Sequence, residues 1–219
     1  MMRRIQLVLI VLLVLSAQPE WLAGGEILDR VVATVNDGVI LESEWDDALR
    51  YECFLNGRPL DQLTPAGRRA ALDRLIDQLL LAQQMETTGF AHATPDEVSA
   101  RIREIRKDMP GAATEVGWKS LLARYGLTAD VLADRVSRQI DLERYVDQRF
   151  RPSVYVDAES IQAYYRSRLV PELQSKRSLV PPLEQVRVRI ERVLTEERVN
   201  ELLTAWLKTL RAQSRIEVK

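Results

Sequence analysis

His92 is the only histidine among the 219 residues, and it stands between two alanines just before a helix-capping pattern. That setting predicts a solvated loop residue and disfavours a zinc cluster, a serine–histidine–aspartate triad or a cysteine–histidine dyad. Cys53 is the only cysteine, so an internal disulfide is excluded. We expect Cys53 to be a small buried apolar residue, with a reactive or intermolecular thiol as the alternative.

Other polar groups that could do chemistry have a simpler explanation on helix surfaces. The acidic pairs are Asp46–Asp47, Glu143 with Asp147, and Glu196–Glu197, and the densest basic group is Arg101, Arg103, Arg106 and Lys107. All three acidic pairs lie near arginines, which favours solvated faces and i,i+4 pairs over a cation or acid–base site. Ser43 is expected to cap a helix, because nothing supplies it with a base. The sequence therefore predicts no catalytic residues, no metal and no cofactor.

The overall charge argues against a nucleic-acid partner. The chain has 31 basic and 32 acidic residues, a net charge of −1 at neutral pH. Such a balance creates no field that would attract nucleic acid or an anionic membrane.

The first 25 residues have the pattern of a secretory signal. Arg3 and Arg4 precede an apolar run from Ile5 to Ala17, which is shorter than a membrane-spanning helix. Cleavage after Ala17 or after Gly25 would fit, and an uncleaved short anchor is the alternative. We expect export to the periplasm and no stable membrane span once residues 1–25 are removed.

Two β-branched runs flank Asn36-Asp37-Gly38 and predict a short hairpin over residues 31–41, with a positive φ at the glycine. Because an isolated hairpin is marginal, it needs a third strand. The only other strand-like segment alternates Ile216 and Val218 with charges. We therefore predict that residues 216–218 pair with residues 31–36.

Helix-capping patterns and apolar periodicity predict helices over the rest of the chain. Caps are expected at Thr64, Thr94, Thr128 and Asp157. The stretch 166–182 contains three prolines among polar residues and is expected to be a linker. A final helix over about 183–214 would be close to 50 Å long at ~1.5 Å per residue. The predicted fold class is mostly α, with a small antiparallel sheet joining the two chain ends.

The order of these elements resembles the SurA-type periplasmic chaperones and peptidyl-prolyl isomerases. The resemblance rests on residues 29–44, Thr94-Pro95-Asp96-Glu97-Val98, Gly126-Leu127-Thr128, Phe150-Arg151-Pro152 and the terminal helix and strand. It implies an N-terminal helical chaperone domain over 26–165, completed by a C-terminal helix and strand over 183–219. It also implies unfolded, aromatic-rich clients such as outer-membrane proteins.

One departure from the family pattern bears on enzyme activity. Family members carry parvulin isomerase domains where this chain has only residues 166–182. A parvulin fold needs about a hundred residues, so isomerase activity is not carried over. The resemblance therefore implies a non-enzymatic chaperone that retains the peptide-binding core.

These patterns favour an ATP-independent holdase, monomeric or weakly dimeric, that binds extended polypeptides in apolar grooves between helices. Aromatic and methionine side chains are the candidates for lining such grooves, namely Met85, Met109, Trp118, Tyr125, Tyr164, Tyr165 and Trp206. Each is also a candidate core residue, so no peptide-binding residue is assigned. The alternative function is a helical envelope adaptor that docks one folded partner. A groove favours the chaperone, whereas a flat apolar patch favours the adaptor.

Overall fold

Both ends of the described chain meet in one small sheet. The computed structural model describes residues 29–86, 88 and 90–219, so the expected signal peptide at 1–25 lies outside the described residues. Strands β1 (Val31–Val35), β2 (Gly38–Leu41) and β3 (Ile216–Val218) form an antiparallel sheet in the order β2-β1-β3. Thr34 pairs with Val39 on one side and with Glu217 on the other. The predicted closure of the domain by residues 216–218 is confirmed.

The hairpin turn differs from the prediction in which residue takes the left-handed conformation. Asn36 has a φ of +55°, whereas Gly38 is the first residue of β2 and has no positive φ. Asparagine tolerates this region because its short side chain bonds locally. Gly38 is constrained by space instead, since a Cβ there would lie 3.0 Å from Cδ2 of Leu79.

Helix α2 (Glu42–Leu55) starts two residues earlier than expected, and Ser43 is not its cap. The backbone N–H of Leu41 donates to Oε2 of Glu44 at 3.0 Å. The Ser43 hydroxyl lies in the first turn and donates to the Asp29 carboxylate, whose pKa this bond lowers. Glu44 thus bonds the backbone N–H at the N-cap, and the Ser43 hydroxyl bonds Asp29 instead of capping the helix.

Three of the following four helices begin at threonines that the sequence indicates, Thr64, Thr94 and Thr128, and the fourth begins at Thr114, which was not expected to be a cap. They are α3 (Pro65–Glu86), α4 (Pro95–Asp108), α5 (Glu115–Arg124) and α6 (Ala129–Phe150), with 3₁₀ turns at Leu60–Gln62 and Arg151–Ser153. Thr94 accepts from the Glu97 N–H while Glu97 accepts from the Thr94 N–H, forming a complete capping box. Thr128 accepts from the N–H of Val131 at 3.2 Å.

The stretch expected to be a linker is helical over its first half. Asp157 caps α7 (Ala158–Tyr164), which continues through a π-helical turn (Tyr165–Leu169) into α8 (Val170–Ser175). Pro171 lies in the first turn of α8, directly after the π-helical turn. Only residues 176–182 are irregular. The division of the chain into domains at 166 and 182 stays a prediction.

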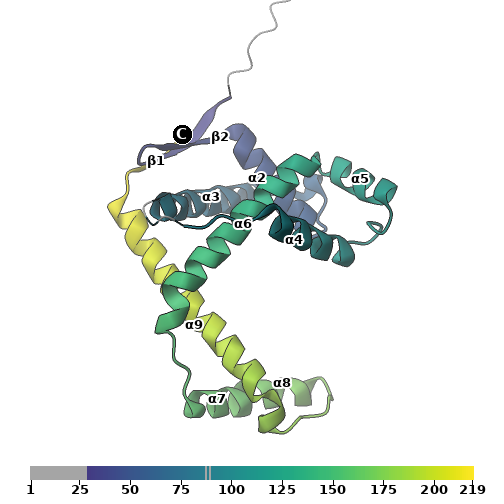
Figure 1. Cartoon of the computed structure of the whole chain (residues 1–219), viewed down its shortest axis with the longest axis vertical. Helices are drawn as coiled ribbons and strands as arrows, with labels where there is room; N and C mark the ends of the chain where they lie inside the picture. The colour runs from purple at the N-terminus through teal and green to yellow at the C-terminus, as the bar shows by residue number, and fades with distance from the viewer. Residues whose placement is uncertain (1–28, 87, 89) are drawn as a thin grey trace, which may run out of the picture.

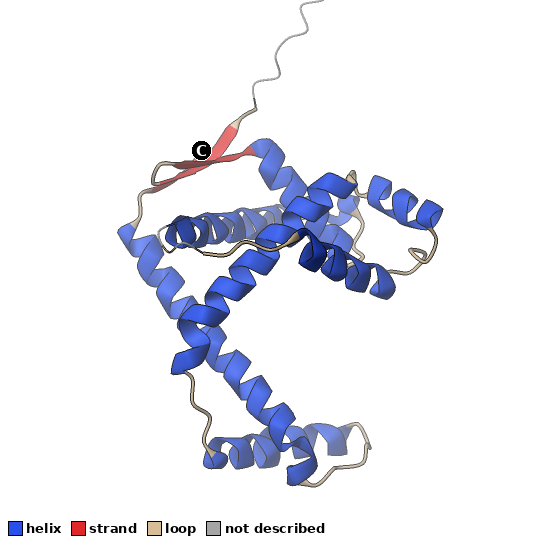
Figure 2. Ribbon diagram, viewed as in Figure 1, coloured by secondary structure: helices blue, strands red, loops and turns tan. Residues whose placement is uncertain are grey.

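Helix α9 (Leu183–Gln213) connects two unequal parts of the molecule (Figure 1). We call the sheet, α2–α6 and the second half of α9 the body, and residues 154–182 with the first half of α9 the arm. Helix α9 starts in the arm, crosses α6 and ends at the sheet, which caps one side of the body (Figure 2). Within the described residues, no helix is long and apolar enough to cross a membrane.

Three apolar clusters hold these parts together. The first joins α2, α4, α5 and α6 around Phe54, and the second joins the sheet and α3 to the end of α9 around Ile76. The third, in the arm, contains Ile161, Val186 and Ile190. Cys53 is buried in the first cluster, where desolvation raises the pKa of its thiol. The expectation of a small buried apolar residue at position 53 is confirmed.

Candidate functional site

An apolar groove runs between β2, α3 and α6, and its volume is about 480 Å³. Helix α3 contributes one wall, because its apolar residues recur at i, i+4 and i+7 and part of that stripe extends beyond the sheet. The apolar lining residues are Val39, Ile40, Leu75, Leu79, Ala82, Met85, Phe90 and Leu142. Water in such a groove has few polar partners, so an apolar ligand would displace it favourably.

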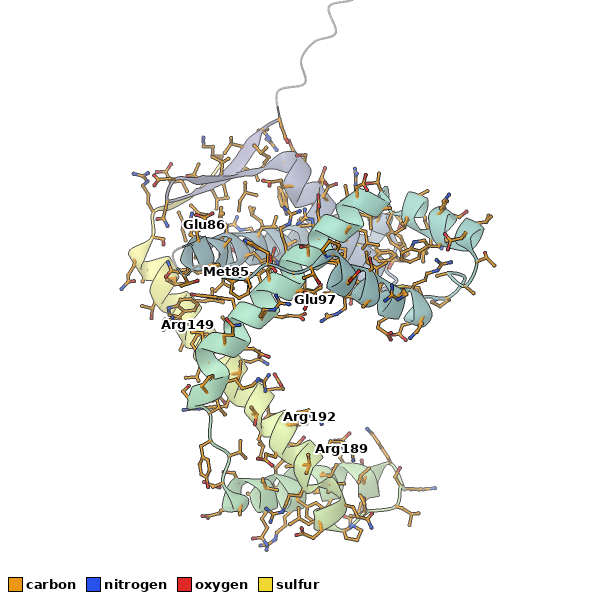
Figure 3. All side chains as sticks on the ribbon, viewed as in Figure 1. Met85, Glu86, Glu97, Arg149, Arg189 and Arg192 are labelled. Atoms are coloured by element: carbon orange, nitrogen blue, oxygen red, sulfur yellow. The ribbon has the colours of Figure 1, made fainter. Side chains whose placement is uncertain are left out.

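The rim of the groove is polar and carries both signs of charge. The polar lining residues are Glu44, Gln78, Glu86, His92, Arg135, Arg138 and Asp141. Met85 and Glu86 lie side by side in the last turn of α3, near α9 (Figure 3). An apolar floor inside a mixed polar rim suits a polypeptide segment better than a small ion.

A buried carboxylate fixes the loop at one end of the groove. Asp141 accepts from the Ala93 N–H at 2.6 Å and lies 2.8 Å from Nδ1 of His92. The His92 side chain is 78% exposed, so it is a solvated loop residue as expected, with a partner that the sequence did not indicate. These bonds hold the segment before α4 against α6, which places Phe90 over the groove.

Arg135 is the most desolvated cation of the groove. Its Nη2 donates to the backbone oxygen of Glu44 at 2.8 Å, while its buried Nε has no hydrogen-bond partner among the described residues. Burial lowers the pKa of this guanidinium, and the neighbouring Arg138 adds to the effect. The side chain therefore braces the start of α2 against α6 beneath the rim.

An aromatic cluster continues from the groove towards α9. Phe90 contacts Tyr145, which contacts Trp206, which contacts Phe150, with ring centroids 5.6–6.1 Å apart. The Arg149 guanidinium lies 4.1 Å from the Trp206 ring centroid, a cation–π distance. Figure 3 shows Arg149 near the crossing of α6 and α9. The cluster fixes the crossing and so supports one end of the groove.

Of the seven candidate lining residues, the structure places only Met85 in the groove. Trp118 and Tyr125 are buried against Phe54, and Met109 packs on the same cluster. Tyr164 and Tyr165 pack in the arm, and Trp206 belongs to the aromatic cluster. The other apolar lining residues are Val39, Ile40, Leu75, Leu79, Ala82, Phe90 and Leu142. Sequence reasoning missed them because a helix stripe that faces a groove has the same period as one that faces a core.

The other polar groups singled out from the sequence are separate from the groove, apart from His92. Glu143 pairs with Arg101, Asp147 and Glu196 share Arg151, and Glu197 pairs with Arg168. Within residues 29–86, 88 and 90–219, no group of three or more histidine, cysteine or acidic side chains could hold a metal ion.

The fold and the groove define a mostly helical module that is closed by a terminal sheet and carries an apolar recess beside an edge strand. Residues 1–146 match the family described as the SurA-like N-terminal domain, and the chain belongs to that family. The match includes every residue that lines the groove, whereas α9 and β3 lie beyond it.

The chain is also similar to a curated chaperone. Chaperone SurA from Hahella chejuensis (strain KCTC 2396) is 26% identical over 154 residues, which cover 68% of this chain. The chain spans about a third of that relative's length, 34%.

Proposed function

We propose that the protein is an ATP-independent holdase chaperone of the periplasm that binds unfolded outer-membrane or other exported proteins. The groove between β2, α3 and α6 is the observation that carries this proposal, because its apolar lining would bury client side chains. Family membership and the name of the curated relative support a chaperone role. The basic and apolar start of the sequence supports export.

The proposal includes binding without prolyl-isomerase catalysis. The family match covers only the N-terminal type of domain, and the interval 166–182 is far shorter than a parvulin fold. In the part of the chain that the structure describes, this interval is short helix and loop packed beside α9.

Aggregation of a client tests the function directly. A urea-denatured outer-membrane β-barrel protein is diluted into buffer with or without the exported, purified chain, and light scattering is followed. The proposal predicts suppression at near-stoichiometric amounts without ATP, and no acceleration of prolyl isomerisation in a peptide assay on the same sample. Unchanged scattering would overturn the holdase and favour an adaptor for one folded partner.

A matched pair of variants on α3 locates the activity. Ala82→Glu places a charge and added bulk in the groove, whereas Ala66→Glu places the same side chain on the exposed first turn of the same helix. We expect Ala82→Glu to reduce suppression severalfold, because a charged group is costly to bury with an apolar client. Ala66→Glu should retain full activity. Equal activity of the two folded variants would remove the groove from the proposal.

A further inference from the structure

The groove lies along the outer edge of β2 and not under one of its faces. Successive residues of a strand point to opposite faces, yet Val39 and Ile40 both line the groove. Ile40 is buried in the second apolar cluster, while the side chain of Val39 faces solvent and the residue is 51% exposed. A cavity that touches both residues must therefore lie beside the backbone, along the exposed edge of β2.

The backbone groups of Val39 point out of the sheet towards this groove. The Glu42 N–H points inward and donates to the Arg30 oxygen at 2.8 Å, while the Leu41 N–H points outward and donates to Glu44. Backbone direction alternates along an antiparallel strand, and Val39 is two residues before Leu41. Its N–H and C=O therefore point outward, and within the described residues they have no partner.

From this edge and the adjoining groove we infer that a client binds as an added β-strand. An extended segment with alternating apolar residues pairs its backbone with Val39 and places its apolar side chains between α3 and α6. This inference rests on the proposed chaperone function and specifies the form of polypeptide that the groove accepts. Unpaired strand edges bind extended chains through backbone bonds, and adjacent pockets select alternate side chains.

An extended segment fits these features better than a helix or a folded surface. A helix has no free backbone donors or acceptors to offer Val39, since its own bonds satisfy them. Glu44 already occupies the neighbouring outward donor of Leu41, so the open part of the edge is short. A short edge beside an apolar recess provides a few backbone bonds and burial for alternate side chains, which allows exchange between different clients.

The opposite edge of the same sheet provides a built-in comparison. The Asn36 N–H donates to Arg215 and the Lys219 N–H donates to Val32, so residues 215, 217 and 219 point inward and Val218 points outward. Val218 is 45% exposed, close to the value for Val39, but it does not line the groove. Both valines have an open backbone, but only Val39 lies beside the apolar groove.

Proline substitutions at the two valines test the inference. Val39→Pro removes the outward N–H without breaking a bond to β1, Val218→Pro does the same on the other edge, and Val39→Thr keeps the N–H. The probe is a fluorescent synthetic peptide in which valine or tyrosine alternates with serine, and its affinity is measured by anisotropy. Val39→Pro should weaken binding about tenfold, the value of one or two lost hydrogen bonds. Val218→Pro and Val39→Thr should bind like the unchanged chain.

N-methylation of the peptide at alternate backbone nitrogens gives a test that does not depend on the variant folding. Methylation of the peptide nitrogens that face β2 should weaken binding by a similar factor. Methylation of the nitrogens that face away from β2 should not. Equal affinity of the Val39→Pro and Val218→Pro variants, or of the two methylated peptides, overturns strand addition. A Val39-dependent dimer in sedimentation experiments also overturns it, because a second copy would then occupy the edge.

The aggregation assay separates this inference from the function on which it depends. If the unchanged chain fails to suppress aggregation, the proposed function fails. If the unchanged chain and Val39→Pro suppress aggregation equally well, the function stands and only the strand-addition mode is lost.

Discussion

The body and the arm are built from the same kinds of helices, yet they differ in how much apolar surface they bury. Among the described residues, the two clusters of the body contain eleven and nine buried side chains, whereas the cluster of the arm contains three. Leu179 of the arm is almost completely exposed. The difference indicates that the arm opens locally at a lower free energy than the body unfolds. Helix α9 belongs to both parts, so its first half depends on the arm and its second half on the body.

The largest expected effect is in the centre of the body. Phe54 is fully buried and contacts Trp118 and Tyr125 edge to face. Phe54→Ala should lower the free energy of unfolding by about 3–5 kcal/mol, because it leaves a cavity among three helices. Urea denaturation followed by tryptophan fluorescence measures the change. A loss below about 1 kcal/mol would mean that this cluster does not carry the stability of the body.

The corresponding change in the arm should act locally. Ile190→Ala removes one of the three buried side chains of the arm, at a local cost of about 2 kcal/mol or more. Hydrogen exchange should accelerate over residues 158–175 and at the start of α9, while α2 and α3 keep their protection. Uniform acceleration across both parts would show that arm and body unfold together, and would contradict a lower opening free energy for the arm.

Loss of an ion pair to α9 should also cost more stability in the body than beside the arm, although both costs are smaller than those of the core substitutions. Nε of Arg211 lies 2.6 Å from Asp77 of α3 in the body, and Nη1 of Arg168 lies 2.8 Å from Glu197 beside the arm. The Arg211 pair is the more buried of the two. Arg211→Gln should cost about 1 kcal/mol and Arg168→Gln about 0.3 kcal/mol, both reduced by salt. Thermal melts at low and high salt measure the difference, and a larger effect of Arg168→Gln would contradict the ranking.

The smallest effects should be those of two capping carboxylates, and they should depend on pH. The Thr94 backbone N–H and then the Arg144 guanidinium lower the pKa of Glu97 below its ordinary value of 4.5. A carboxyl group whose pKa is lower in the folded state stabilises it above the unfolded pKa. This contribution is lost as the pH falls through the folded value. Glu97→Gln should therefore lower the melting temperature of the body slightly at pH 7, and the difference should shrink as the pH falls below the ordinary pKa of 4.5.

The arm supplies the matched control for that experiment. Bonds from Ser160, the backbone N–H first, lower the pKa of Asp157, which caps α7. Asp157→Asn should change hydrogen exchange in α7 with the same pH dependence and leave the main melting transition in place. A shift of the main transition by Asp157→Asn, equal to that of Glu97→Gln, would contradict the separation of body and arm.

Much of the fold could be predicted because local signals agree with the tertiary structure. The caps at Thr94, Thr128 and Asp157 are side-chain to backbone bonds within one turn, so sequence spacing determines them. Pairing of residues 216–218 with β1 could be predicted because an isolated hairpin needs a third strand and the chain offered one candidate.

The features that could not be predicted depend on tertiary space. Leu79 leaves little space at Gly38, where a Cβ would lie 3.0 Å from Cδ2 of Leu79, and the helix over 165–175 packs on α9 despite its proline. The groove was missed for the same reason. Leu75 and Leu79 have the pattern of core residues, and only the position of β2 and α6 leaves part of them uncovered.

The closure of the sheet by β3 has a consequence for the timing of folding. Asn36 in the hairpin turn bonds the backbone of Arg215, which is 179 residues further along the chain. When the polypeptide emerges from a ribosome or a translocon, its N-terminus comes first. The residues of the hairpin are therefore available long before those of β3. Contacts so distant in sequence slow folding. The last step in maturation should be the docking of α9 and β3, and until then the chain itself exposes an unpaired strand, the kind of surface that chaperones recognise.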